Sequence, residues 1–114
     1  MFRDYGKAYL LRRHTSFIVR LLNIIDEMSR NIGRNPYTRE VLTKIKAWGH
    51  GHKMLKLAHA LGLVERYEDF LIRGKSKIRV VFNKVTKIGY MLLEIYKLLN
   101  KEDGETEEND EDDD

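Results

Sequence analysis

The chain has 114 residues, of which 42% are apolar, and this length allows one domain with one modest core. It contains no cysteine, which excludes disulfide bonds and cysteine zinc sites and indicates a reducing compartment. No apolar run approaches the ~18 residues that a membrane span needs, and arginines interrupt the N-terminal segment where a signal peptide would be apolar.

The net charge of +3 conceals a strong asymmetry along the chain. Residues 101–114 hold ten acidic residues and one lysine, whereas residues 1–100 hold 20 Lys and Arg against 8 Asp and Glu. The basic body predicts a polyanionic partner. The tail has almost no apolar residue, so we expect it to be disordered. The absence of glutamine and cysteine, with abundant Lys, Arg and Ile, resembles the usage of a thermophile and suggests an archaeal source.

The first part of the chain predicts an arm followed by two helices. Residues 1–15 are basic and aromatic, and are expected to form an N-terminal arm or a short helix. A helix should begin at Thr15 or Ser16, because apolar residues then recur with a helical period until the breakers of residues 31–36. Thr38 should cap a short second helix that carries Glu40 in its first turn.

The second part predicts a helix, a hairpin and a last helix. Residues 47–51 suit a tight connection with two glycines, and a third helix is expected from His52 to Leu61, stopped by Gly62. Residues 63–72 and 78–85 have the β-branched and aromatic content of strands, joined by a basic loop over residues 73–77. Thr86 should cap a final helix over about residues 87–100.

These elements predict a mainly α domain with a small β hairpin (α+β), in the order α-α-α-β-β-α, over residues 16–100. Residues 38–61 suit a helix-turn-helix, in which the second helix enters the major groove of DNA. Such a helix needs a buried stripe and an outer face of cations or donors, and the third helix has both.

Two motifs make the likeness more specific. Leu55–Arg66, with its Gly-Leu-Val-Glu-Arg turn, resembles the recognition helix and exit of winged-helix regulators of the MarR, ArsR and PadR type. Val85–Gly89 is similar to the Leu-Thr-x-x-Gly segment that opens their last helix. The resemblance implies a winged helix-turn-helix that binds double-stranded DNA. It assigns DNA contacts to the third helix and to the tip of the hairpin, or wing, at His52, Lys53, Lys56, His59, Arg73, Lys75 and Lys77.

Two functional hypotheses follow. The first is a transcriptional regulator or chromatin-associated factor, cytoplasmic and nucleoid-associated, with modest sequence specificity, because the third helix lacks Arg, Asn and Gln as base readers. The second is an accessory subunit of a DNA-processing or transcription machine, such as a DNA polymerase holoenzyme. RNA binding through the same face is a third possibility. The apolar last helix predicts a homodimer or partner interface at Ile88, Met91, Leu92, Ile95 and Leu99.

Other features have simpler interpretations. The histidines at 14, 50, 52 and 59 have no acid or cysteine at ligand spacing, so no metal site is expected. Trp48 should pack in the core at the helix turn. The chain has no phosphate loop or nucleophile motif, so neither an enzyme nor a cofactor is expected. The acidic tail is either a solubilising end or a segment that competes with phosphate for the basic face.

Overall fold

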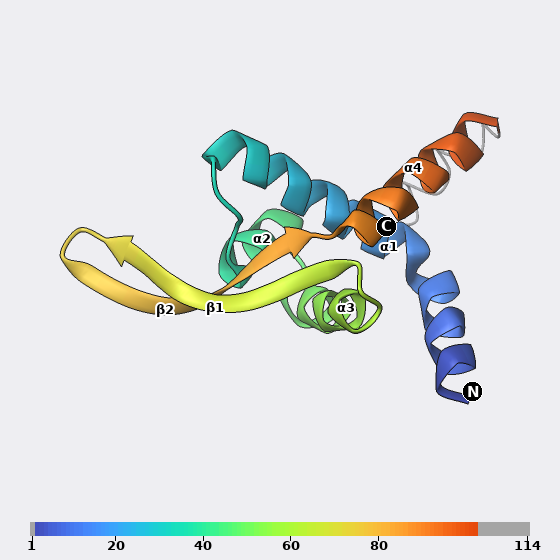
Figure 1. Cartoon of the computed structure of the whole chain (residues 1–114), viewed down its shortest axis with the longest axis horizontal. Helices are drawn as coiled ribbons and strands as arrows, with labels where there is room; N and C mark the ends of the chain where they lie inside the picture. The colour runs from blue at the N-terminus through green and yellow to red at the C-terminus, as the bar shows by residue number, and fades with distance from the viewer. Residues whose placement is uncertain (1, 103–114) are drawn as a thin grey trace.

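The fold follows the order α1, α2, α3, β1, β2, α4 in this computed structural model, which describes residues 2–102 and the side chains of residues 12–100 (Figure 1). The helices and strands are α1 (Phe2–Ile32), α2 (Thr38–Ile45), α3 (Trp48–Ala60), β1 (Val64–Arg73), β2 (Ser76–Val85) and α4 (Lys87–Glu102). The predicted order and the mainly helical class with one small hairpin are confirmed. Residues 101–102 of the predicted tail end α4, and residues 103–114 lie outside the described residues.

Helix α1 joins the predicted helix to a preceding helical segment. It runs from Phe2, with a kink at His14, whose φ of −113° and ψ of 19° are not helical. The kink directs the first part of the helix away from the other elements (Figure 1). The second helical segment therefore starts directly after His14, close to the predicted start at Thr15 or Ser16. Residues 2–13 form the short helix that was one of the two predicted alternatives, rather than an extended arm. Thr15 Oγ1 lies 3.4 Å from the Arg12 carbonyl oxygen, a bond within the helix.

The core forms where α1, α2 and α3 meet the base of the hairpin. The helical period predicted for α1 is confirmed, because Ile18, Leu21, Leu22 and Ile25 are fully buried. Each helix and both strands contribute to this one cluster, so the core holds α3 and the hairpin in a fixed relation. Its other buried members are Val19, Val41, Leu42, Ile45, Met54, Leu55, Ala58, Leu63, Val64, Val85 and Leu93.

The connection between α2 and α3 is shorter than predicted. Lys46 has a left-handed conformation (φ 61°) and donates its N–H to the Leu42 carbonyl, and Trp48 already begins α3. Gly51 therefore lies inside a helix, where a Cβ atom would be 2.9 Å from Leu42 Cδ2. The glycine permits close helix packing rather than a turn. Trp48 is 51% exposed, so its predicted place in the core is wrong.

The end of α3 matches its prediction. Gly62 has a φ of +79°, its N–H bonds the His59 carbonyl, and the Leu63 N–H bonds the Ala58 carbonyl. These paired bonds form a Schellman motif, which explains why the helix stops before a glycine. The chain then turns directly into β1, so the outer face of α3 and the hairpin have a fixed relative orientation.

Strands β1 and β2 pair over their full length, from Val64 opposite Val85 to Arg73 opposite Ser76. The turn is shorter than the predicted loop and contains only Gly74 and Lys75, with Gly74 at a φ of +62°. A positive φ at the first central residue is typical of a type II′ turn. The base of the hairpin is buried, residues 72–79 are exposed, and the hairpin projects beyond the helices (Figure 1).

Asn83 anchors the hairpin to the segment before α2. Its side chain is fully buried and donates to the Pro36 carbonyl and Thr38 Oγ1, both at 3.3 Å. Its Oδ1 accepts a 3.0 Å hydrogen bond from Arg66 Nε.

Thr38 is the first residue of α2 rather than its predicted cap. Tyr37 is the capping residue, and its N–H donates a 3.1 Å hydrogen bond to Glu40 Oε1.

Thr86 and Gly89 join the hairpin to α4. Thr86 Oγ1 donates to the Gly62 carbonyl at 2.6 Å and accepts the Gly89 N–H at 3.0 Å, which confirms the predicted cap. Gly89 lies so close to Leu63, the residue before β1, that a Cβ atom would overlap the Leu63 carbonyl oxygen. The predicted Thr-x-x-Gly motif therefore fixes where α4 leaves the hairpin.

Candidate nucleic-acid interface

The outer face of α3 is basic and free of acids. Lys53, Lys56 and His59 are exposed and His52 is half-buried, while Met54, Leu55 and Ala58 hold the opposite face in the core. No acidic residue occurs between Trp48 and Ala60. Four of the predicted site residues thus lie together on one surface. α3 has no acidic side chain that would repel a phosphate there.

The imidazole of His52 lies in a distinct electrostatic environment. Burial lowers its pKa, and the nearby cations Lys56 and Arg66 lower it further. The ring is therefore neutral at pH 7, and a phosphate beside it would favour the protonated form. This makes His52 a candidate for pH-dependent anion contact.

The distal part of the hairpin carries the other predicted cations. Arg73, Lys75 and Lys77 are all exposed, and no acid occurs between residues 70 and 80. Arg73 donates a 3.0 Å hydrogen bond to the Tyr37 hydroxyl, and Lys77 Nζ lies 5.0 Å from the centre of the Phe70 ring. These contacts orient two of the three cations without neutralising them.

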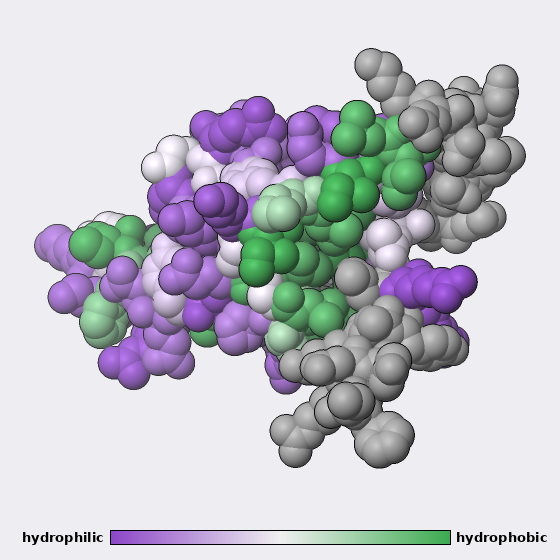
Figure 2. Space-filling view, turned by 45° about the vertical axis from the view of Figure 1, so that its right-hand side comes forward, coloured by the Kyte–Doolittle hydropathy of each residue, from purple (hydrophilic) through white to green (hydrophobic). Residues whose placement is uncertain are grey.

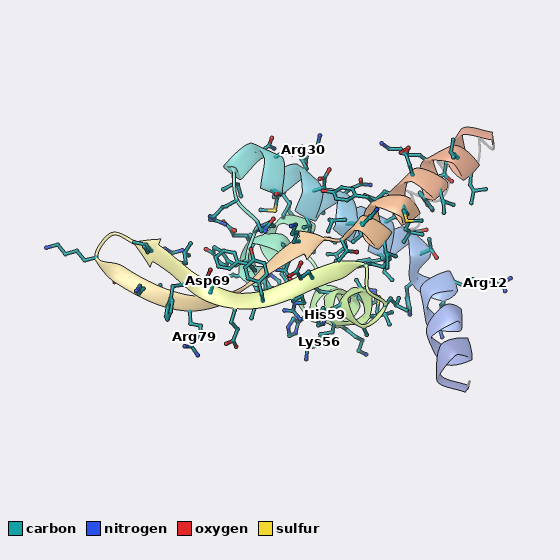
Figure 3. The ribbon with its side chains drawn as sticks, in the orientation of Figure 1. Arg12, Arg30, Lys56, His59, Asp69 and Arg79 are labelled. Carbon is teal, nitrogen blue, oxygen red and sulfur yellow. The ribbon has the colours of Figure 1, made fainter. Side chains whose placement is uncertain are left out.

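Sequence reasoning missed Arg79. Its guanidinium carbon lies 5.4 Å from the Phe70 ring centre, and the side chain points to the same side of the molecule as Lys56 and His59 (Figure 3). Its nearest acid, Glu68, is 3.8 Å away, and both side chains are exposed, so the ion pair is weak. The signal was present, because Lys77 and Arg79 alternate along β2 and therefore share a face.

Arg66 connects the hairpin with the helix-turn-helix segment. In addition to the bond from Nε to Asn83, Arg66 Nη2 donates a 3.0 Å hydrogen bond to Thr38 Oγ1. Burial lowers the pKa of this guanidinium. No described buried polar side-chain atom lacks a hydrogen-bond partner. The polar network thus fixes the hairpin against the start of α2, the first helix of the helix-turn-helix segment.

A groove separates the distal half of the hairpin from α2 and the start of α3. Its volume is about 1430 Å³, and among its lining residues are Arg39, Lys44 and Trp48. Glu40 is the one acid among the described lining residues, and both of its carboxylate oxygens accept hydrogen bonds from Arg34, at 2.9 and 3.0 Å. This groove is called the hairpin groove below.

A separate apolar surface covers the outer side of α4. Figure 2 shows it as a green area on the side of the molecule opposite the hairpin tip. The predicted interface residues Ile88, Met91, Ile95 and Leu99 are all more than half exposed, whereas Leu92 is half-buried and packs against the core. Four of the five predicted residues thus share a free face, and exposed Leu98 adds to it.

The other predicted features do not form a second site in the described residues. His14 and Phe17 pack edge-on against His50, at ring-centre distances of 5.9 and 4.6 Å. Among the described side chains of residues 12–100, no group of three His, Asp or Glu is placed to hold a metal ion. None of the described helices has the length and apolar character required to cross a membrane.

Comparisons with known proteins give no match. No family model, curated protein or solved structure is similar to this chain at a significant level.

Proposed function

We propose that the protein binds double-stranded DNA as a winged helix, with α3 in the major groove and the hairpin as the wing. The observation that carries the proposal is the shared basic side of α3 and the hairpin tip. Lys56 and His59 of α3 point the same way as Arg79 of the hairpin (Figure 3), and neither α3 nor residues 70–80 contain an acid. A duplex lying across both elements would contact cations on α3 and at the hairpin tip.

The charges predict how binding depends on salt. The two exposed lysines of α3 and the four cations of the hairpin tip are available to phosphates. Each neutralised phosphate contributes about −0.9 to the slope of log K against log salt, so contact by all six gives a slope of about −5. Contacts of this kind position the protein without reading bases.

Sequence specificity should be modest. The face of α3 turned to solvent offers lysine and histidine, and α3 contains no Arg, Asn or Gln to bond the edges of bases in pairs. A chromatin-associated factor or a regulator of broad specificity fits this surface better than a highly selective repressor.

The proposal is tested by fluorescence anisotropy with a labelled blunt duplex of about 20 base pairs, compared across a salt series. We expect affinity that falls steeply with salt and differs little between unrelated sequences. The same titration with residues 1–102 tests whether the acidic tail competes with phosphate, in which case the shorter chain binds more tightly. Absence of duplex binding by both forms at about 50 mM salt contradicts the proposal.

The exposed side of α4 favours a second candidate function, docking on another protein. Met91 and Ile95 are each more than half exposed in a row of apolar side chains, an arrangement typical of an interface. A homodimer through α4 would place two DNA-binding faces on one particle, and docking on a larger subunit would make the protein an accessory factor. Light scattering of the wild type and of Met91→Glu separates these cases. A dimer that the substitution dissociates supports the first, and a wild-type monomer favours the second.

A further inference from the structure

The hairpin groove is larger than a typical site for a small ligand. Its volume of about 1430 Å³ exceeds the roughly 300–1,000 Å³ of sites for drug-sized molecules. One wall is formed by α2 and the first turn of α3, and the other by the distal halves of both strands. These dimensions suit a few units of an extended polymer.

The charge of the groove selects an anionic polymer. Arg39, Lys44 and Arg73 line it with exposed side chains. Arg79 also lines it, but its guanidinium lies over the Phe70 ring on the other face of the hairpin. The carboxylate of Glu40 does not offset them, because its oxygens accept two bonds from Arg34 and one from the Tyr37 N–H. Three cations along an open groove match a chain with a negative charge on each unit.

Apolar side chains between these cations restrict the polymer further. Leu71, Ile78 and Val80 face the groove from the hairpin, and Trp48 lines it from the start of α3. The indole is half exposed, and Gly49 beside it has no heavy atom within 4 Å of the position of a Cβ atom. About half of the Trp48 surface is thus available for contact with a flat ring.

We infer that the hairpin groove binds an unpaired DNA strand, with a base stacked on Trp48 and its phosphates on the groove cations. The inference rests on the proposed function, because Arg73 and Arg79 belong both to this groove and to the duplex-binding hairpin tip. A duplex on the basic face would then continue as a single strand into the groove. The preferred ligand is a junction between double- and single-stranded DNA.

An unpaired strand fits the groove better than a duplex or an acidic peptide. Bases inside a duplex are stacked on each other, so their faces are not available to an indole. An acidic peptide satisfies the cations but brings no aromatic face to Trp48. Base–aromatic stacking changes affinity by about 5- to 150-fold per base, so its loss is measurable.

The chain itself provides the probe, because Trp48 is its only tryptophan. Intrinsic fluorescence of the full chain is titrated with oligothymidylate of about 10 nucleotides, with a blunt duplex, and with the same duplex carrying a thymidylate extension. We expect quenching by the oligothymidylate and the extended duplex, and little change with the blunt duplex. Anisotropy should show about 10-fold tighter binding to the extended duplex than to the blunt one.

Two matched variants assign the effect to the indole. Trp48→Ala should remove the preference for the extended duplex and leave the affinity for the blunt duplex within about twofold, which also shows that the variant is folded. Trp48→Phe keeps an aromatic face and should retain most of the preference. The inference is overturned if Trp48→Ala keeps the wild-type preference, or if a polyglutamate peptide quenches Trp48 more strongly than oligothymidylate does.

The same titrations separate this inference from the proposed function. Blunt-duplex binding without quenching by oligothymidylate overturns the inference and leaves the proposed function intact. Quenching by oligothymidylate without any blunt-duplex binding refutes the duplex proposal and supports the groove as a single-strand site.

Discussion

Replacement of Asn83 by alanine should weaken both the fold and the DNA-binding surface. The side chain accepts one bond from the Arg66 guanidinium and donates two bonds of 3.3 Å to Pro36 and Thr38. A bond to a charged group contributes about 1.5–3 kcal/mol, and a neutral bond about 1 kcal/mol or less at this length. Asn83→Ala should therefore lower the free energy of unfolding by about 3 kcal/mol, a large part of the roughly 5–15 kcal/mol of a small domain.

Urea unfolding followed by circular dichroism, at one fixed protein concentration, measures this loss. Asn23→Ala is the matched control, because Asn23 is exposed on α1 and its replacement should change the free energy of unfolding by less than about 0.5 kcal/mol. Asn83 fixes the hairpin against the start of α2, so the variant should also bind duplex more weakly under conditions where it is folded. A loss below about 1 kcal/mol would refute the claim that this network anchors the hairpin.

Three further predictions concern single side chains. Gly89→Ala should lower the free energy of unfolding by about 1–3 kcal/mol, because its Cβ would overlap the Leu63 carbonyl. Gly49→Ala is the control, because a Cβ atom there meets open space. Equal melting temperatures for the two variants would contradict this prediction. Burial alone would raise the pKa of Glu40, but its bonds to an arginine and a backbone N–H leave it lowered. The ionised Glu40 therefore stabilises the fold above the pKa that it has in the unfolded chain, and this stabilisation is lost as the pH falls through its pKa in the folded protein. In Glu40→Gln, the free energy of unfolding should decrease less steeply as the pH is lowered through this range. Because its pKa is lowered, the His52 imidazole is neutral in the protein without DNA. The affinity for duplex should therefore increase as the pH is lowered from about 8 to about 6, when His52 gains a proton beside a phosphate. A His52→Gln variant with the same pH profile as the wild type would show that His52 does not bind phosphate in this way.

Local patterns predicted most of the fold. The spacing of Ile18, Leu21 and Leu22 identified the buried face of α1, and the glycine at 62 identified the end of α3. The exceptions have local causes as well. Gly49 and Gly51 suggested a turn, but at Gly51 the missing side chain instead allows α3 to approach α2. A glycine occurs both in tight turns and where two helices pack closely, so the sequence alone does not distinguish the two at this position.

The candidate site was only partly predictable, because its geometry depends on contacts between distant residues. Lysines on α3 and at the hairpin tip were found from their charge and their place in the pattern. The bond between Arg66 and Asn83 joins positions 17 residues apart, and Asn83 reaches Pro36 across 47 residues. No pattern in the local sequence indicates hydrogen-bond partners that are this far apart in the chain. The half exposure of Trp48, which makes the hairpin groove a stacking site, likewise follows only from where α3 begins.

The most direct test of the account compares two doubly substituted chains for duplex binding across a salt series. Lys53→Gln with Lys56→Gln removes two charges from the outer face of α3, and Lys87→Gln with Lys97→Gln removes two exposed charges from α4. If DNA binds to the outer face of α3, the first pair should reduce the salt slope by about 2 and the affinity by at least tenfold at low salt, while the second pair should leave both nearly unchanged. Equal losses for the two pairs would mean that overall charge alone drives binding, and would contradict a DNA-binding face built on α3.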